Sequence, residues 1–218
     1  ETLIEDGKSQ SDIRQGVTLE VFGEGMSWGP LNQVLKENIL KNQGDIKYDI
    51  NWTTLGEYLQ FLEEKGISTN VASFIGATTL RINAVGYENK KPNDSELEIM
   101  KNLVHQGMKE GAMGIGSSLI YAPAFYSGTE ELVEICKIAA QYDGMYISHM
   151  RSEGNRLLES VDELLTIAND AGIRAEIYHL KQSGKNNWNK LDRVVQKIDS
   201  ARAEGLKITT DMYTYIAG

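Results

Sequence analysis

The sequence passes repeatedly from a segment with helical spacing, through a glycine, into a short run rich in β-forming residues. The junctions are about 30 to 45 residues apart, which suits units of one strand and one helix. Glycine favours the left-handed conformation that closes a helix, and a short loop can then enter a strand. The junction glycines are Gly66, Gly111, Gly144, Gly172 and Gly205.

Several of the β-rich runs are almost continuously apolar, as expected of parallel strands that are covered on both faces. The pattern therefore predicts an α/β fold, an incomplete (β/α)8 TIM barrel in which residues 1–218 form a single domain. A doubly wound open sheet is the rival architecture, but no GxGxxG follows a first strand, which weakens a dinucleotide-binding interpretation. The expected strands are 17–24, 68–77, 112–120, 144–151, 174–181 and 207–215.

Helix starts and loops can also be predicted. Ser95 with Glu98, and Ser127 with Glu130, fit the spacing of a capping box. The polar stretch 86–94 reads as a surface loop. Leu157, Leu158, Val161, Leu164, Leu165 and Ala168 share one face at helical spacing.

Charge and cysteine content exclude some functions. The net charge of −9 argues against non-specific binding of nucleic acid or of an anionic membrane, because both require basic patches. No run approaches 18 apolar residues, and the polar first residues do not resemble a signal peptide. We therefore expect a cytoplasmic protein, with a periplasmic location left open. Cys136 is the only cysteine, and its helical context predicts a buried structural thiol.

Two histidines stand at the ends of successive predicted strands. His149 closes MYISH and His179 closes RAEIYH. The carboxyl ends of barrel strands face the functional rim, so the two imidazoles should lie together there. Paired imidazoles suit zinc, which accepts nitrogen ligands and keeps an open position in catalytic sites. The alternative is a pair of core histidines that are satisfied by hydrogen bonds.

These residues resemble the amidohydrolase superfamily and, within it, the N-acyl-D-amino-acid deacylases, or D-aminoacylases. SHMRSEG followed about thirty residues later by HLKQSG is the most specific part of the resemblance. The other matching segments are QGVT (15–18), GATTLR (76–81), ELEIMKNLVHQGMKEGAMGIGSSLIYAP (96–123) and DMYTY (211–215).

The resemblance implies that His149 and His179 are zinc ligands, in a site for one or two ions. It also implies that Lys181 and Tyr121 hold the carboxylate of a small N-acyl amino acid. The chemistry agrees, because a cation and a phenol near a metal can fix an anionic substrate. The alternatives are a rim lysine in a surface ion pair and a tyrosine that packs beside Pro123. Arg151 could bind the carboxylate or pair with Glu153 as scaffold.

The chain departs from the family pattern in three places. The HxH strand that begins the family's barrel is absent, and the family's catalytic aspartate would lie beyond Gly218, so no catalytic residue is assigned. The chain is thus expected to be an internal fragment covering roughly the second to seventh strands. Where many members read GNCG, this chain reads Gly23-Glu24-Gly25-Met26, with Gly25 at the position of the cysteine ligand. Adjacent Glu24 is a candidate replacement ligand, since carboxylates also bind zinc; the alternative is a solvent-facing turn residue.

Two further residues are assigned minor roles. Mid-helix His105 is not expected to be catalytic, and Asp211, expected inside a strand, could support a ligand from behind.

Three functions are compatible with the sequence. The first is zinc-dependent hydrolysis of N-acyl-D-amino acids by a parent enzyme, with little turnover from the fragment alone. The second is a related amidohydrolase for a cyclic amide or dipeptide, which Lys181 disfavours because it suits an acidic open-chain substrate. The third is a non-catalytic barrel fragment or interaction unit. Open barrel edges predict self-association.

Overall fold

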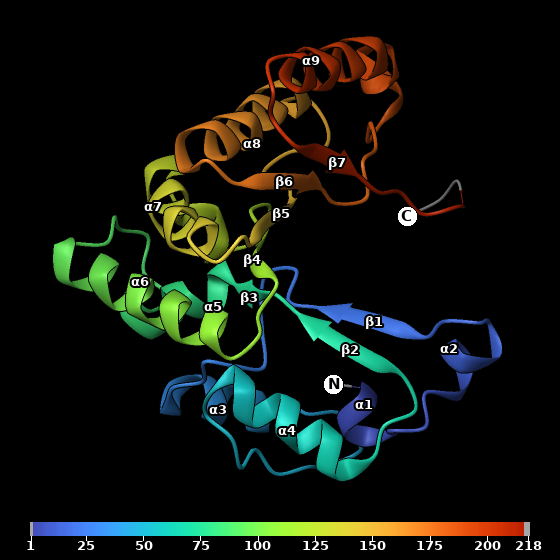
Figure 1. The fold of residues 1–218 in the computed structure, drawn as a ribbon, viewed down its shortest axis with the longest axis vertical. Coiled ribbons are helices and arrows are strands. Elements are labelled where there is room, and N and C mark those ends of the chain that lie inside the picture. Colours follow the sequence, from blue (N-terminus) through green and yellow to red (C-terminus); the bar gives the residue numbers. More distant parts are fainter. Residues whose placement is uncertain (1, 216–218) are drawn as a thin grey trace.

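The computed structural model describes residues 2–215, and these form a curved α/β arrangement. The strands follow one another along an open curve, and the helices cover its outer side (Figure 1). The strands are β1 (Leu19–Phe22), β2 (Asn70–Ser73), β3 (Ile75–Gly76), β4 (Gly114–Ser118), β5 (Met145–His149), β6 (Arg174–Ile177) and β7 (Ile208–Thr210).

Helices precede β1 and occupy the intervals between successive strands, except the interval between β2 and β3. The α-helices are α1 (Thr2–Glu5), α2 (Gln10–Arg14), α3 (Gln33–Lys41), α4 (Leu55–Lys65), α5 (Ala77–Ala84), α6 (Asp94–Lys109), α7 (Thr129–Ala140), α8 (Leu157–Ala171) and α9 (Leu191–Ala203). Two 3₁₀ helices, η1 (Ala124–Tyr126) and η2 (Lys185–Lys190), interrupt the loops after β4 and β6.

All strand pairings among the described residues are parallel, and they follow the order of the chain. β1 pairs with β2, while β3, β4, β5, β6 and β7 form a second sheet in that order. β2 and β3 are separated only by Phe74, whose backbone N–H donates to the carbonyl of Phe22 at 2.8 Å. The expected partial barrel is confirmed, and the predicted strand 68–77 is divided into two.

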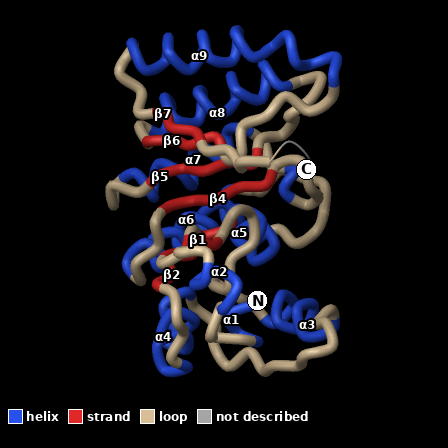
Figure 2. Tube along the Cα trace, turned by 90° about the vertical axis from the view of Figure 1, so that its right-hand side faces the viewer, coloured by secondary structure: helices blue, strands red, loops and turns tan. Residues whose placement is uncertain are grey.

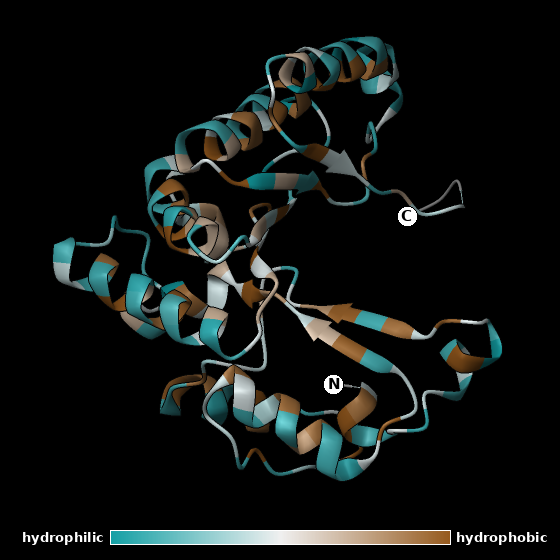
Figure 3. Ribbon diagram, viewed as in Figure 1, coloured by the Kyte–Doolittle hydropathy of each residue, from teal (hydrophilic) through white to brown (hydrophobic). Residues whose placement is uncertain are grey.

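The core lies between the sheet and the outer helices. Tyr146, Ala175 and Ile177 are buried under α7 and α8, and the predicted face of α8 buries Leu157, Val161 and Leu164. Figure 2 shows the strands stacked side by side with α8 and α9 beyond β7. Hydrophilic and hydrophobic residues alternate along α6, α8 and α9, as expected of amphipathic helices (Figure 3). None of the described helices is long and apolar enough to cross a membrane.

The predicted capping boxes were wrong. α6 begins two residues earlier than expected, with Asn93 as N-cap and Glu96 as its reciprocal partner. α7 has Gly128 at its N-cap, without a side-chain cap, and Ser127 instead donates to Glu131 at 3.0 Å. For α6 the sequence spacing fits both Ser95 with Glu98 and Asn93 with Glu96, and Asn93 is the residue in extended conformation at the helix start.

The segment after β1 crosses the inside of the sheet. Gly76 and Gly116 leave space there, because a Cβ atom at either position would overlap the backbone carbonyl of Gly25 or Gly23. Close backbone approach of this kind requires glycine. The segment that carries Glu24 is thereby held against β3 and β4.

A buried ion pair joins α5 to α7. Arg81 is fully buried and donates to both carboxylate oxygens of Glu131, at 3.0 and 2.8 Å. Its other terminal nitrogen donates to the carbonyls of Glu88 and Lys90, at 3.1 and 2.6 Å. Arg81 therefore fixes the loop between α5 and α6 to the body of the protein.

Candidate metal centre

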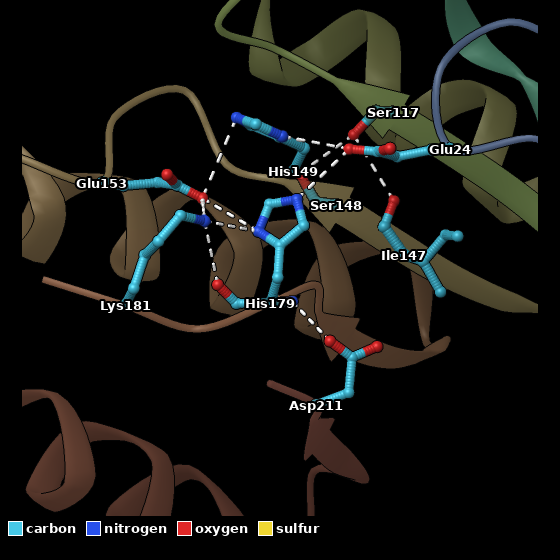
Figure 4. A network of polar contacts seen from close by, with 9 residues as sticks. All are labelled: Glu24, Ser117, Ile147, Ser148, His149, Glu153, His179, Lys181 and Asp211. Carbon is cyan, nitrogen blue, oxygen red and sulfur yellow. Dashed lines mark hydrogen bonds and ion pairs between the residues drawn. The ribbon is translucent and has the colours of Figure 1, made fainter. Parts of the chain in front are cut away.

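The two histidines come from neighbouring strand ends. His149 is the last residue of β5, and His179 follows the end of β6 by two residues. Their ring centroids are 4.4 Å apart. The structure thus brings together the two imidazoles that the sequence placed on one rim, and Figure 4 shows them between Glu24 and Glu153.

Glu24 joins this pair from a distant part of the chain. Its Oε1 lies 3.0 Å from Nδ1 of His149 and 3.3 Å from Nε2 of His179. The hydrogen bond from His149, supplemented by that from His179, lowers the pKa of the Glu24 carboxyl, although partial burial opposes this effect. Gly25 cannot take this place, because a Cβ atom there would lie 2.7 Å from Cβ of Ser118. The side chain that reaches the imidazoles is therefore that of Glu24, one residue before the position expected for the cysteine.

The donor set fits zinc. One ligand atom from each of Glu24, His149 and His179 lies within 4.8 Å of the others. Ligands at about 2.0–2.1 Å from a tetrahedral zinc are roughly 3.3 Å apart, close to the two distances from Glu24. His149 faces this point with Nδ1, the nitrogen that lies 3.0 Å from Oε1 of Glu24.

Glu153 stands behind the two imidazoles. Its buried carboxylate oxygen Oε1 lies 3.0 Å from Nδ1 of His179 and 3.8 Å from Nε2 of His149. If Nε2 of His179 binds a metal, Nδ1 carries the proton and donates it to a carboxylate, as in many metal sites. The sequence had suggested Glu153 only as a partner for Arg151. The available signal was its position four residues after His149, in the loop that follows a strand end.

Lys181 lies on the far side of His179 from Glu24 (Figure 4). Its Nζ donates to Oε1 of Glu153 at 2.5 Å and to the carbonyl of His179 at 3.0 Å. Nδ1 of His179 is also close, at 2.8 Å. If that nitrogen is protonated, one N–H of Lys181 stays available for a substrate. The ammonium is partly exposed, so a carboxylate can reach it.

The backbone of His179 has an uncommon conformation. Its φ is 38°, in the left-handed region that few non-glycine residues adopt. Asp211 holds this conformation, because its Oδ1 accepts a 2.5 Å hydrogen bond from the backbone N–H of His179. Asp211 follows β7 and does not lie inside a strand as predicted, since β7 ends at Thr210.

The other two predicted substrate contacts lie on the His149 side. The exposed ring of Tyr121 is centred 5.3 Å from that of His149. Arg151 makes a bidentate pair with Glu163, at 2.9 Å for both bonds, and also donates to the carbonyls of Phe125 and Ser127 at 2.8 Å. These bonds occupy most of the guanidinium and favour a scaffold role, with Glu163 as partner.

His105 and Cys136 lie away from the centre. His105 is in α6, where its Nδ1 contacts the hydroxyl of Tyr142 at 2.9 Å. Cys136 is buried in α7, and burial raises the pKa of its thiol.

The chain is similar in sequence and in fold to known deacylases. The chain is 30% identical to D-aminoacylase from Alcaligenes xylosoxydans xylosoxydans, over 94% of this chain and 42% of that protein. A structure solved to study the binuclear metal centre of D-aminoacylase superimposes with a TM-score of 0.87 and 27% identity, over 99% of this chain and 45% of that one. N-acyl-D-glutamate deacylase from Bordetella bronchiseptica, solved with zinc and a phosphonate inhibitor, has the same fold, with a TM-score of 0.88 at 24% identity. It matches 98% of this chain and 45% of that one.

The chain thus spans less than half the length of these relatives. No family model matches it.

Proposed function

Since this chain belongs to the N-acyl-D-amino-acid deacylase family of amidohydrolases, we propose that the protein hydrolyses the amide bond of N-acyl-D-amino acids with zinc. The convergence of Glu24, His149 and His179 around one point supports the proposal most directly. Zinc bound there would polarise the amide carbonyl and lower the pKa of a water molecule.

Other residues of this chain bind the substrate or orient the side chains of the site. Lys181 binds the substrate carboxylate by a charge-assisted hydrogen bond and so places the amide beside the imidazoles. Glu153 orients both Lys181 and His179 through the same carboxylate oxygen. Asp211 holds the turn that aims His179 inward. Glu24 and Glu153 already accept hydrogen bonds at this site, so we assign neither as the proton acceptor.

Substrate pairs can test the proposed activity. With zinc, the protein in its complete native length is expected to release the free amino acid from N-acetyl-D-alanine. A chelator should abolish this release, and added zinc should restore it. Amino acid release can be followed by chromatography, with N-acetyl-L-alanine, a hydantoin and a dipeptide as comparison substrates. Preference for the hydantoin or the dipeptide would contradict the proposal in favour of a related amidohydrolase.

We also propose that the protein self-associates through its outermost strands. β1 pairs only with β2, and β7 only with β6, among the described residues. Leu19 and Val21 of β1 are exposed apolar side chains. Unpaired edges of this kind favour pairing with another strand.

A charge on the edge strand should weaken this association. Val21→Lys is expected to shift residues 1–218 toward the monomer, because a charged edge disfavours strand pairing. Analytical ultracentrifugation measures the change, and Val34→Lys, on the exposed side of α3, is the matched control. A concentration-independent monomer for the unaltered chain would contradict the proposal.

A further inference from the structure

A pocket of about 380 Å³ lies beside the candidate metal centre. Gly25, which follows Glu24, forms part of its lining, and so does Tyr121, whose ring is centred 5.3 Å from that of His149. The volume is within the range of small-molecule pockets. The pocket therefore opens next to the imidazole of His149.

The lining is mostly apolar, although Thr78 and Ser118 also contribute to it. Met26, Ile82 and Pro123 contribute to it together with the rings of Tyr87 and Tyr121, and no charged side chain is among the described residues that line it. Met26 is 46% exposed and Tyr121 is 61% exposed, so they present apolar surface to an incoming molecule. Burying an alkyl group in this pocket would be favourable, because its apolar surface would leave water. Burying a carboxylate would be unfavourable, because the charge would lose its hydration and find no cation in the lining.

Residues that do not line the pocket hold its Tyr87 side in place. The hydroxyl of Tyr87 accepts a 2.6 Å hydrogen bond from the side-chain amide of Asn38. Arg81 holds the following residues of the same loop through the carbonyls of Glu88 and Lys90. The Tyr87 side of the pocket is therefore held in place, which limits the entropy that ordering it on binding would cost.

The order of the groups across the site indicates which part of the substrate would enter the pocket. Lys181 contacts His179, while the pocket borders His149 on the opposite side of the centre. In an N-acyl amino acid, the amide lies between the carboxylate and the acyl chain. With the carboxylate at Lys181 and the amide at the centre, the acyl chain extends toward Tyr121 and Met26.

We propose that this pocket binds the acyl chain of the substrate and selects an uncharged chain longer than acetyl. The inference rests on the proposed deacylase function and adds the acyl specificity. It also places Tyr121 beside the acyl chain, away from the carboxylate.

A series of N-acyl-D-alanines with zinc-loaded protein tests the inference. From acetyl to butyryl to hexanoyl, kcat/KM is expected to rise roughly threefold per added methylene until the pocket is full. The succinyl derivative should be hydrolysed at least about tenfold less efficiently than the butyryl derivative. Met26→Arg should reverse this order by placing a cation in the pocket. Val34→Arg adds the same charge on the exposed side of α3 and should leave the order unchanged.

Calorimetry on the zinc-free protein separates this inference from the proposed function. N-hexanoyl-D-alanine should bind more tightly than N-acetyl-D-alanine, and Met26→Arg should remove the difference. Hydrolysis with equal efficiency and equal affinity for all acyl chains would overturn the acyl pocket and leave the deacylase function standing. Tighter binding of the hexanoyl compound without hydrolysis of any of them would support the pocket and overturn the deacylase function.

Discussion

Each of the substitutions Glu24→Ala and His179→Ala is expected to remove zinc from the site and to reduce the rate of hydrolysis by more than about a hundredfold. Loss of an outer-shell partner of a metal ligand typically costs 10–100-fold in affinity or activity, and loss of a ligand itself should cost more. Both residues offer an atom to the same point, with Oε1 of Glu24 3.3 Å from Nε2 of His179. Zinc content by mass spectrometry and zinc affinity by calorimetry would be measured beside turnover, in the protein at its complete native length.

Two further variants make this experiment specific. Glu24→Cys should retain zinc, because a thiolate is also a zinc ligand. Glu176→Ala removes a carboxylate from β6 that bonds to Thr209, at 2.6 Å, and should leave zinc binding intact. Normal zinc affinity in Glu24→Ala would show that Glu24 is not a ligand and that its contacts with the imidazoles are only hydrogen bonds.

Lys181→Met is expected to keep the zinc and lower kcat/KM by roughly ten- to a hundredfold. The substitution retains the bulk of the side chain but removes one charge-assisted hydrogen bond to the substrate, worth about 1.5–3 kcal/mol. The decrease should nearly vanish for a substrate analogue in which a neutral amide replaces the carboxylate. Kinetics with both substrates and zinc content of the variant are the measurements.

A second lysine provides the control for this prediction. Lys185 lies in η2, is exposed, and carries the same charge; Lys185→Met should change neither kinetics nor zinc content. Glu153 complicates the interpretation, because loss of Lys181 also removes its partner at 2.5 Å. An equal loss for the anionic and the neutral substrate would therefore mean that Lys181 acts through Glu153 and His179 and does not bind the carboxylate.

The proposed acyl pocket and the proposed carboxylate contact at Lys181 lie on opposite sides of the same centre, so each should govern the preference for a different part of the substrate. Lys181 would select for an anionic group, and Met26 and Tyr121 for an apolar one. Variants on one side should change the preference for one part of the substrate only. Effects of distant substitutions usually add, so a Lys181→Met and Met26→Arg double variant provides a check on this separation.

Local patterns in the sequence were sufficient for the architecture. Apolar runs and the glycines at helix ends predicted the parallel strands and their order, because these features depend on neighbours in the chain. Gly66 and Gly172 close helices with φ of 75° and 63°, as predicted. At the Gly144 junction, Asp143 takes the left-handed conformation instead, with φ of 55°. The N-cap residues were predicted less well, because more than one pair of nearby residues can have the three-residue spacing of a capping box.

The sequence by itself determined that His149 and His179 would meet, because strand ends of a parallel sheet share one rim. Only the tertiary structure decided how their partners are arranged. Glu24 reaches the imidazoles because Gly76 and Gly116 let its segment cross the sheet, and no local pattern encodes that approach. The pairing of Arg151 with Glu163 left Glu153 to contact Lys181 and His179. Several carboxylates at similar sequence distance could have met each cation, and the packing of the loops on the helices selected among them.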